Sequence, residues 1–348
     1  MQYFDIRMKY RLFLIIATSV VLGGMTSCSR DDESTVHPDG GQRIPISFNA
    51  CIGEEAAEVS TRGYTPNING TGYIFSGQEK LSIGITGVTG TGSTGRSTTE
   101  EVKVYNIAAG DASNTTGSPR ALSFEGNAID AFVWMGKNET LSLRAWTYGD
   151  DSTPTTDPLG NTFTIETNQN TGATADIKEL LYSPPTNYNY ATNNGSITIP
   201  LYHQLTRVII NIKSEQTLSN VIIGDSNLPT SATFGYTSGN YGTWSDHSGE
   251  GTIIPKDEVT TDGYDKTYSA VLIPGTGADY NDGSFVLKIT TTDGVNTGNY
   301  LYAMPLLDNS FDPGMQYTFN ISITRHLLSV TSITITPWTE DVWNIVAQ

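Results

Sequence analysis

The fold class is decided by one stretch of the sequence, Tyr317-Thr318-Phe319-Asn320-Ile321-Ser322-Ile323. Apolar side chains occupy every second position in it, which is the period of a β-strand with one buried face and one wet face. Gly, Asn, Asp and Pro clusters separate such runs and predict turns between strands. The sequence therefore predicts an all-β protein made of sandwiches. The same alternation recurs at residues 44–52, 81–85, 141–146, 162–165, 208–212 and 285–289.

Helical patterns are scarce, and the best of them is a short run at residues 175–181. The chain also contains 35 glycines, which agrees with many turns. A regular alternation of strands and helices, as in parallel α/β folds, is therefore disfavoured.

The chain is acidic, with 19 Lys and Arg against 36 Asp and Glu and a formal net charge of −17. Binding to nucleic acid needs clustered cations that neutralise phosphates, and the sequence holds no such cluster. Acidity instead favours solubility outside the cell. We therefore expect no nucleic-acid partner.

The N-terminus has the pattern of an export signal. Lys9 and Arg11 precede an apolar run at residues 12–21, which is too short to span a bilayer. Small residues follow, and Met25-Thr26-Ser27-Cys28 resembles a bacterial lipobox, in which the cysteine is lipidated. The usual Leu or Val stands three residues before the cysteine, where this chain has Met25. The alternative is an ordinary signal peptide with a coincidental cysteine.

These features divide the chain into four segments. Residues 1–27 form the expected lipoprotein signal peptide, and residues 28–42 form a flexible tether. A Pro- and Asn-rich stretch at residues 183–196 suggests a boundary between two domains, at 43–195 and 196–348. Cys51 is the one cysteine that remains beside Cys28, so no disulfide is expected to stabilise the fold.

Seven segments follow one another along the chain, at residues 44–63, 81–85, 176–182, 201–208, 271–274, 311–317 and 333–338. In this order they resemble the fimbrillin superfamily of Bacteroidales, in particular its fimbrillin-like A group. The family's usual Gly-Asp before the segment at 81–85 is replaced here by Gln78-Glu79-Lys80. The resemblance implies two tandem transthyretin-like Greek-key β-sandwich domains. It also implies export as a lipoprotein and assembly into fimbriae for cell adhesion and biofilm formation.

Assembly in this family implies strand exchange, which is physically reasonable because an added strand satisfies the open edge of a sheet. We expect residues 44–52 to be a removable first strand and Arg62 to be the proteolytic processing site. A neighbour's C-terminal segment, roughly residues 329–348, would then fill the groove. Cleavage at Arg43 would leave the strand in place. The alternative is a permanent first strand with an uncut Arg62.

We expect no catalytic, cofactor-binding or metal-ligating residue. His203 is interpreted as a structural histidine, and the glycine-rich residues 87–95 lack the Gly-Lys-Ser/Thr ending of a phosphate loop. The Asp- and Asn-rich loops at 279–283, 293–299 and 308–314 do not match the calcium-loop spacing and are interpreted as turns, with calcium binding left open.

The predicted function is thus a structural or adhesive fimbrial subunit at the outer membrane and in the fimbrium, not an enzyme. Its expected partners are other fimbrial subunits, surface ligands of the host or of bacteria, and the outer membrane through Cys28. Stalk, tip and anchor roles remain open. The alternatives are a surface lipoprotein that binds glycan or host protein without polymerising, and a β-sandwich hydrolase. The candidates for an exposed aromatic binding surface are Tyr188, Tyr190, Tyr236 and Tyr241.

Overall fold

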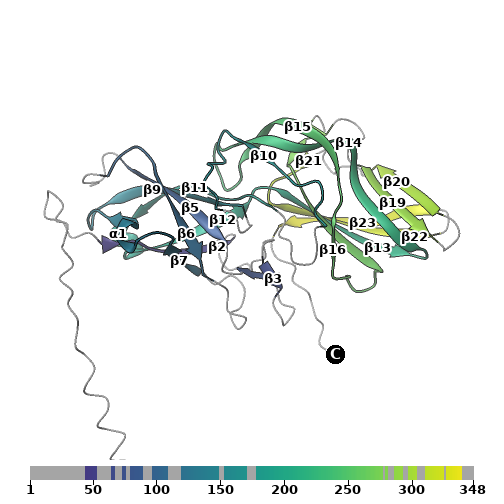
Figure 1. The fold of residues 1–348 in the computed structure, drawn as a ribbon, viewed down its shortest axis with the longest axis horizontal. Coiled ribbons are helices and arrows are strands. Elements are labelled where there is room, and N and C mark those ends of the chain that lie inside the picture. Colours follow the sequence, from purple (N-terminus) through teal and green to yellow (C-terminus); the bar gives the residue numbers. More distant parts are fainter. Residues whose placement is uncertain are drawn as a thin grey trace, which may run out of the picture. The chain divides into compact units, whose positions relative to one another are not determined.

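In the computed structural model the regular secondary structure is almost entirely β-strand, as the alternation predicted (Figure 1). Among the residues it describes, the only helices are η1 (Ala128–Asp130) and α1 (Tyr190–Asn193). Neither has the length or hydropathy of a membrane span. One compact unit begins at Ile44. The described residues are 44–52, 64–66, 73–75, 79–88, 96–108, 119–148, 153–170, 178–276, 279–280, 286–292, 297–303, 310–324 and 327–338.

The N-terminal half of this unit is a closed barrel of seven strands. Neighbouring strands are mostly antiparallel, but β12 and β2 run parallel. Their side chains alternate between the interior and the surface, which produces the period-two pattern of the sequence. In order around the barrel, the strands are β11 (Leu181–Asn189), β12 (Ser196–His203), β2 (Ser47–Ile52), β7 (Arg120–Phe124), β6 (Glu101–Ile107), β5 (Lys80–Gly87) and β9 (Thr140–Thr147).

The C-terminal half contains two five-stranded sheets. The β14 sheet is organised around the long strand β14 (Thr217–Gly235), which pairs first with β19 and then with β15 and β10. The β13 sheet has the order β16-β17-β13-β22-β23, and β13 and β22 are parallel. The other strands of these sheets are β10 (Thr162–Thr164), β15 (Thr243–Ile253), β19 (Val286–Thr292), β20 (Thr297–Ala303), β16 (Lys256–Glu258), β17 (Lys266–Leu272), β13 (Thr206–Ser214), β22 (Met315–Thr324) and β23 (Leu327–Pro337).

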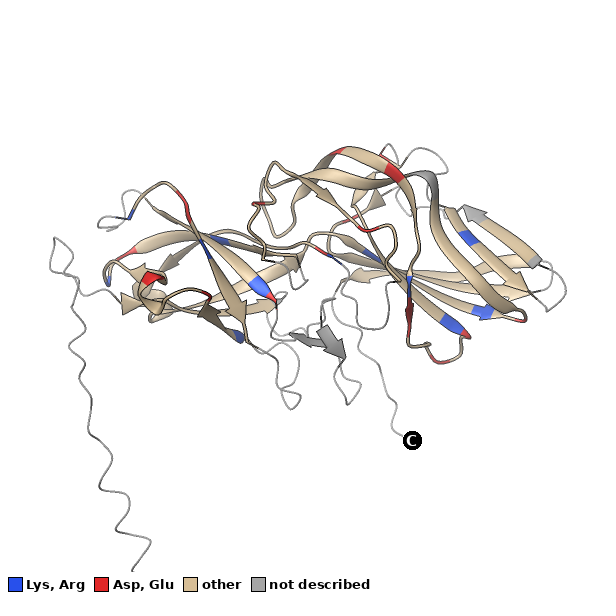
Figure 2. Cartoon of the chain, in the orientation of Figure 1, with Lys and Arg blue, Asp and Glu red and all other residues tan. Residues whose placement is uncertain are grey.

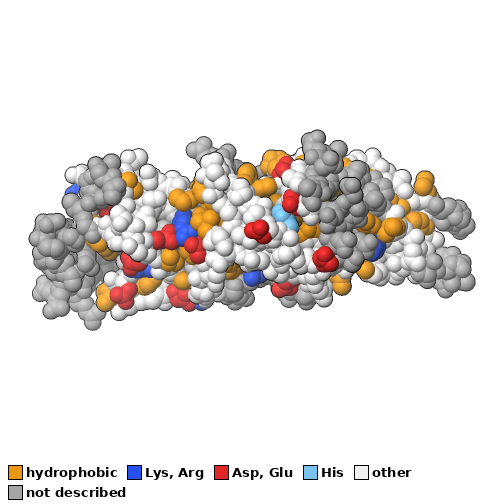
Figure 3. All heavy atoms as spheres, turned by 90° about the horizontal axis from the view of Figure 1, so that it is seen from above, with side chains coloured by type: hydrophobic (Ala, Val, Ile, Leu, Met, Phe, Trp, Pro, Cys, Tyr) orange, Lys and Arg blue, Asp and Glu red, His pale blue; other side chains and the backbone are white. Residues whose placement is uncertain are grey.

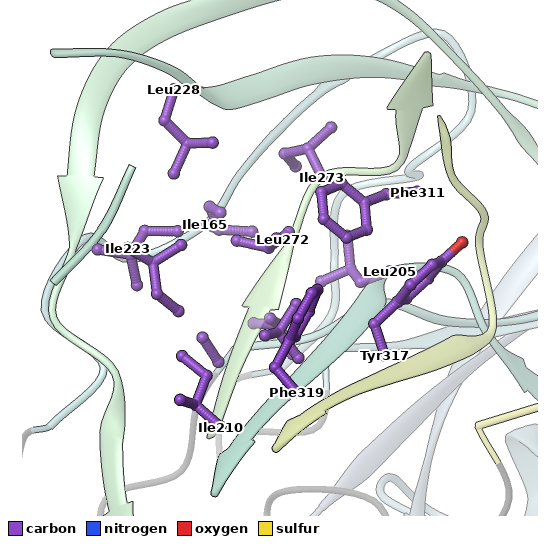
Figure 4. Close-up of a cluster of buried hydrophobic side chains, with 14 of the residues drawn as sticks. Ile165, Leu205, Ile210, Ile223, Leu228, Leu272, Ile273, Phe311, Tyr317 and Phe319 are labelled. Carbon is purple, nitrogen blue, oxygen red and sulfur yellow. The ribbon is translucent and has the colours of Figure 1, made fainter. Parts of the chain in front are cut away.

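Buried apolar side chains from both of these sheets form one hydrophobic cluster (Figure 4). Ile210 and Phe319 come from the β13 sheet, and Ile223 comes from the β14 sheet. Phe311 and Tyr317 meet edge to face, with 4.8 Å between their ring centroids. Burial of each large side chain contributes about 1.5–3 kcal/mol, so this cluster holds the sheets together without a disulfide.

The barrel has a second hydrophobic cluster of its own. It includes Phe48 from β2, Ile83 from β5, Leu143 from β9 and Ile199 from β12. Within the described ranges there are also three short ladders, which join β1 (Ile44–Pro45) to β8 (Val133–Trp134), β18 (Gly275–Thr276) to β21 (Ser310–Phe311), and β3 (Tyr64–Pro66) to β4 (Tyr73–Phe75).

The stretch at 183–196 forms regular structure where the sequence suggested a boundary. It contains most of β11, then α1, and returns into β12. Pro184 and Pro185 lie where the pairing of β11 with β9 shifts between Ser183 and Thr186, so their missing N–H groups interrupt no regular ladder. Residues 178–180 of the predicted helix are not helical and Leu181 begins β11, whereas residues 175–177 lie outside the described residues.

Strands before and after His203 pair with different partners, because β12 belongs to the barrel and β13 belongs to the β13 sheet. Strand β12 still pairs with β2 and β11, whereas β13 pairs with β17 and β22. Strand β10, although it precedes β11 in sequence, belongs to the β14 sheet. The division at residues 195 and 196, and the transthyretin-like Greek-key topology, stay predictions.

Candidate functional site

The expected first strand, residues 44–52, forms β1 and β2, and β2 is an integral part of the barrel. It lies between β12 and β7, and its parallel register with β12 runs from Ser47 opposite Ser196 to Ile52 opposite Leu201. The Ile46 N–H donates to the Phe132 carbonyl at 3.0 Å. The strand is thus held by segments that are distant in the sequence.

Side chains of this segment fill the barrel interior. Ile46, Phe48 and Ala50 are buried, as the even-numbered alternation of the sequence predicts. Phe48 makes edge-to-face contacts with Tyr105 at 5.2 Å and with Phe132 at 6.4 Å between ring centroids. Removal of β2 would therefore expose the barrel core as well as two strand edges.

Burial also raises the pKa values of two titratable side chains in and around β2. It raises the pKa of Tyr105 to about 12, and the phenol oxygen accepts a hydrogen bond from the Phe132 N–H at 3.1 Å. Burial likewise raises the pKa of the Cys51 thiol, which lies 3.8 Å from the Ile199 carbonyl oxygen. A raised pKa leaves little thiolate at neutral pH, so Cys51 is a poor nucleophile.

The last described strand, β23, ends in a ring contact at Trp338. The indole stacks on the His203 imidazole with 3.9 Å between centroids and 14° between planes. His203 Nδ1 lies 3.1 Å from Glu179 Oε2, and all three side chains are buried. His203 is thus a structural histidine that connects β12, the segment before β11 and the end of β23.

Gly314 supports the same end of β23. Its φ of +69° is in the left-handed region, and an added Cβ would lie 2.2 Å from Tyr241 Cε1. The Gly314 N–H donates to the Leu205 carbonyl, and its own carbonyl accepts from the Trp338 N–H. Only glycine combines this φ with this close aromatic contact.

Arg144 joins two loops across the barrel wall. Its guanidinium contacts Glu100 at 2.6 Å and Asp157 at 2.8 Å, and it lies over the Trp146 ring. Burial opposes its charge, but the two carboxylates outweigh burial and raise the pKa of Arg144. A Cβ on Gly84 would lie 2.5 Å from Glu100 Oε1, so glycine leaves room for this carboxylate.

On the face shown in Figure 3, acidic and basic side chains lie in small groups rather than in one large patch of either sign. The His247 side chain belongs to another such group, because its Nδ1 lies 3.3 Å from Asp279 Oδ1 and its Nε2 lies 2.7 Å from the Pro274 carbonyl oxygen. Within the described ranges, neither His203 nor His247 is hydrogen-bonded to Ser, Thr or Cys, and no cluster of metal-ligating residues is found.

Asp279 is a candidate calcium ligand with two described hydrogen bonds to its carboxylate. Its Oδ2 accepts from the Thr276 N–H at 2.7 Å and from the Thr276 hydroxyl at 2.8 Å. Burial opposes ionisation, but these bonds and nearby His247 outweigh it and lower the pKa of the Asp279 carboxyl. The carboxylate therefore closes a turn. Much of the other candidate loops lies outside the described residues.

The predicted site residues Cys28 and Arg62 lie outside the described residues, so both stay predictions. Of the tyrosines considered for a binding surface, Tyr241 is 40% exposed. The other three are half-buried, and Tyr190 packs edge to face on Trp134. The contact between Trp338 and His203 was not predicted, because no sequence pattern links residues this far apart.

Comparison with known proteins agrees with this architecture. The fimbrillin-like family matches residues 70–338. A candidate cell adhesion protein from Bacteroides uniformis is 16% identical and has a TM-score of 0.55, covering 87% of this chain and 100% of its own.

A second candidate cell adhesion protein, from Bacteroides ovatus, is 18% identical, also with a TM-score of 0.55, and covers 86% of this chain and 99% of its own. The tip fimbrial protein Mfa3 from Porphyromonas gingivalis is 10% identical with a TM-score of 0.44, covering 85% of this chain and 100% of its own. No curated protein matches the sequence. The match to the family over most of its length shows that this chain belongs to the fimbrillin-like family.

Proposed function

We propose that this chain is a fimbrial subunit that reaches the cell surface as a lipoprotein on Cys28 and assembles by strand exchange. The observation that carries the proposal is the position of β2 between β12 and β7. Its hydrogen-bond partners and its core contacts come from distant segments, so after one cut at Arg62 only non-covalent contacts would hold it in the fold.

Cleavage after Arg62 would release residues 28–62 together with the lipid. The barrel would then present the unpaired edges of β12 and β7 beside the space vacated by Ile46, Phe48 and Ala50. An incoming strand with apolar residues at alternate positions would restore both the hydrogen bonds and the core contacts. This requirement makes polymerisation depend on processing.

The donor is a C-terminal segment of a neighbouring copy. Within the expected range 329–348, residues up to Pro337 already pair with β22, and Trp338 stacks on His203. Donation of β23 would require both contacts to break, whereas residues 339–348 carry Val342, Trp343, Ile345 and Val346 beyond that anchor. We therefore assign the donor to residues 339–348 in the first instance.

The proposed surroundings are the outer membrane before cleavage and the fimbrium after it, where the subunit serves adhesion and biofilm formation. The partners are other fimbrial subunits and surface ligands. We assign no catalysis. A glycan-binding lipoprotein that does not polymerise is less well supported, because Tyr188, Tyr190 and Tyr236 are half-buried in the fold.

The test compares polymers from cells that carry the natural chain, Arg62→Ala or Arg43→Ala. The natural chain should give a ladder of multimers on unboiled gels, and N-terminal sequencing of the polymer should begin at Gly63. Arg62→Ala should abolish the ladder and leave a lipid-bearing monomer.

Arg43→Ala is the matched control, because it removes the other basic residue near the strand. It should leave the ladder unchanged. A polymer whose subunits begin at Cys28, or a ladder that persists in Arg62→Ala, would contradict the proposed processing.

A further inference from the structure

Among the described strands, β23 forms one edge of the β13 sheet. It pairs antiparallel with β22, with Ser332 opposite Asn320, Thr334 opposite Thr318, and Trp338 donating its N–H to Gly314. Hydrogen-bonded and non-hydrogen-bonded pairs alternate in such a ladder. The backbone N–H and C=O groups of Ser332, Thr334 and Thr336 therefore point toward β22. The backbone N–H and C=O groups of Ile333 and Ile335 point outward, beyond the edge of the sheet.

This edge lacks the usual protection against pairing. Natural edge strands are commonly short or charged, as β16 is with Lys256 and Asp257 (Figure 2). The edge strand β15 carries Asp246 and Glu250. By contrast, the eleven residues of β23 contain no charge, and its neighbour β22 contains none either.

The regular part of this edge has an internal symmetry. Thr331 is an extra residue at a bulge, because Ser332 pairs with Asn320 while Val330 pairs with Ile321. At the other end, Pro337 has no N–H to donate. The run between these limits, residues 332–336, is centred on Thr334.

We propose that this edge binds β23 of a second copy of the chain, antiparallel and across a two-fold axis at Thr334. Ile333 of one copy would exchange N–H···O=C bonds with Ile335 of the other, and Ile335 with Ile333. The contact is self-complementary, as two-fold interfaces must be. It is a side-to-side contact between whole subunits and does not depend on the proposed strand exchange.

The net charge of −17 makes two copies of the chain repel each other. A contact between copies is therefore least opposed where the surface is uncharged, as it is along β23. The exposed side chains beside this edge are Ser332, Thr334 and Thr336, which neither attract an oppositely charged partner nor repel an identical one.

The geometry gives a direct test by cross-linking. In this register Thr334 faces its own counterpart in a non-hydrogen-bonded pair, with Cα atoms about 4.5 Å apart. This distance lies within the range for a disulfide. In the full chain carrying Cys28→Ser, Thr334→Cys should form a disulfide dimer on mild oxidation. Thr243→Cys, an exposed position on β15, and the Cys28→Ser parent should stay monomeric.

Charge substitution tests the same contact in solution. By sedimentation velocity the Cys28→Ser chain should show a reversible dimer, and Thr334→Lys with Thr336→Lys should raise its dissociation constant about tenfold or more, because like charges face each other. Thr162→Lys with Thr243→Lys adds the same charge to exposed threonines of β10 and β15 and should leave the dimer intact.

A parent that stays monomeric at every soluble concentration, or Thr334→Cys that cross-links no faster than Thr243→Cys, would overturn the proposal. The dimer should persist in Arg62→Ala and should dissociate in sodium dodecyl sulfate, whereas the strand-exchanged ladder should need Arg62 and survive the detergent. Failure of one contact is therefore distinguishable from failure of the other.

Discussion

Gly314 shows how a single residue can be fixed by two independent constraints. Its φ of +69° favours glycine, and Tyr241 occupies the space where a Cβ would lie. Gly84 has only the second constraint, because the Glu100 carboxylate lies against it. Both glycines stand in motifs that the sequence made visible, but the reason for each is visible only in the fold.

These constraints predict a difference between two substitutions. Gly239→Ala, at a φ of +84° with nothing within 4 Å, should cost about 1–2 kcal/mol of stability from backbone strain alone. Gly314→Ala should cost a further ~1–3 kcal/mol from overpacking against Tyr241. Urea denaturation measures both. Adding Tyr241→Ala to Gly314→Ala should recover part of the loss, and equal costs at the two glycines would contradict the clash.

The lowered pKa of Asp279 predicts that its carboxylate contributes to the free energy of unfolding in a pH-dependent way. Its pKa is lowered in the fold, so its contribution is complete above the unfolded pKa of about 3.9 and is lost as the pH falls through the lower folded pKa. Asp279→Asn should therefore flatten the loss of stability below about pH 4. Thermal unfolding at a series of pH values measures this slope, and an unchanged slope would show that the turn does not stabilise the ionised form.

At the scale of elements, β23 is held at its end by one aromatic ring. Trp338 stacks on His203, while its Nε1 has no hydrogen-bond partner among the described residues. The indole thus acts through its surface rather than through its polar atom.

Two substitutions at Trp338 should separate these properties. Trp338→Ala removes the stacked ring and should cost about 3–5 kcal/mol, with early hydrogen exchange of the β23 amides. Trp338→Phe keeps a ring over His203 and loses no hydrogen bond, so it should cost roughly 1–2 kcal/mol. Mass spectrometry of exchanged peptides would follow β23. Equal protection of β23 in both variants would refute the anchor.

Some elements could be predicted and others could not, for physical reasons. The alternation at residues 317–323 and 208–212 correctly indicated strands, because period two is a local property. The partners of these strands are not local: β13 pairs in parallel with β22, more than a hundred residues away. Pro184 and Pro185 suggested a domain boundary, and the bulge in β11 that accommodates them is visible only in the fold.

The same limit applies to the candidate site. Ile46, Phe48 and Ala50 were identifiable as one apolar face, but their position between β12 and β7 required the fold. The stacking of Trp338 on His203 joins residues 135 positions apart in the sequence, by their numbering. Local patterns therefore predicted the strands, whereas the contacts that hold β2 and the end of β23 in place are visible only in the folded structure.

For the whole molecule, the net charge of −17 predicts how self-association responds to salt. Raising NaCl from about 20 mM to about 150 mM shortens the range of repulsion and should strengthen the proposed β23 dimer. Sedimentation equilibrium at several salt concentrations measures the dissociation constant. A constant that rises with salt would indicate that ion pairs, rather than the neutral edge, hold the copies together.

The parallel pairing of β2 with β12 means that β2 must wait for its partner strand during synthesis. Asn49 and Ser196 are hydrogen-bonded across 147 residues, so β2 is synthesised long before its partner. At ~5–20 residues per second, the ribosome needs about 7–30 s to make the intervening chain. The segment that is made first is therefore paired late, and during that interval its apolar face is open to any chaperone that can bind an extended strand.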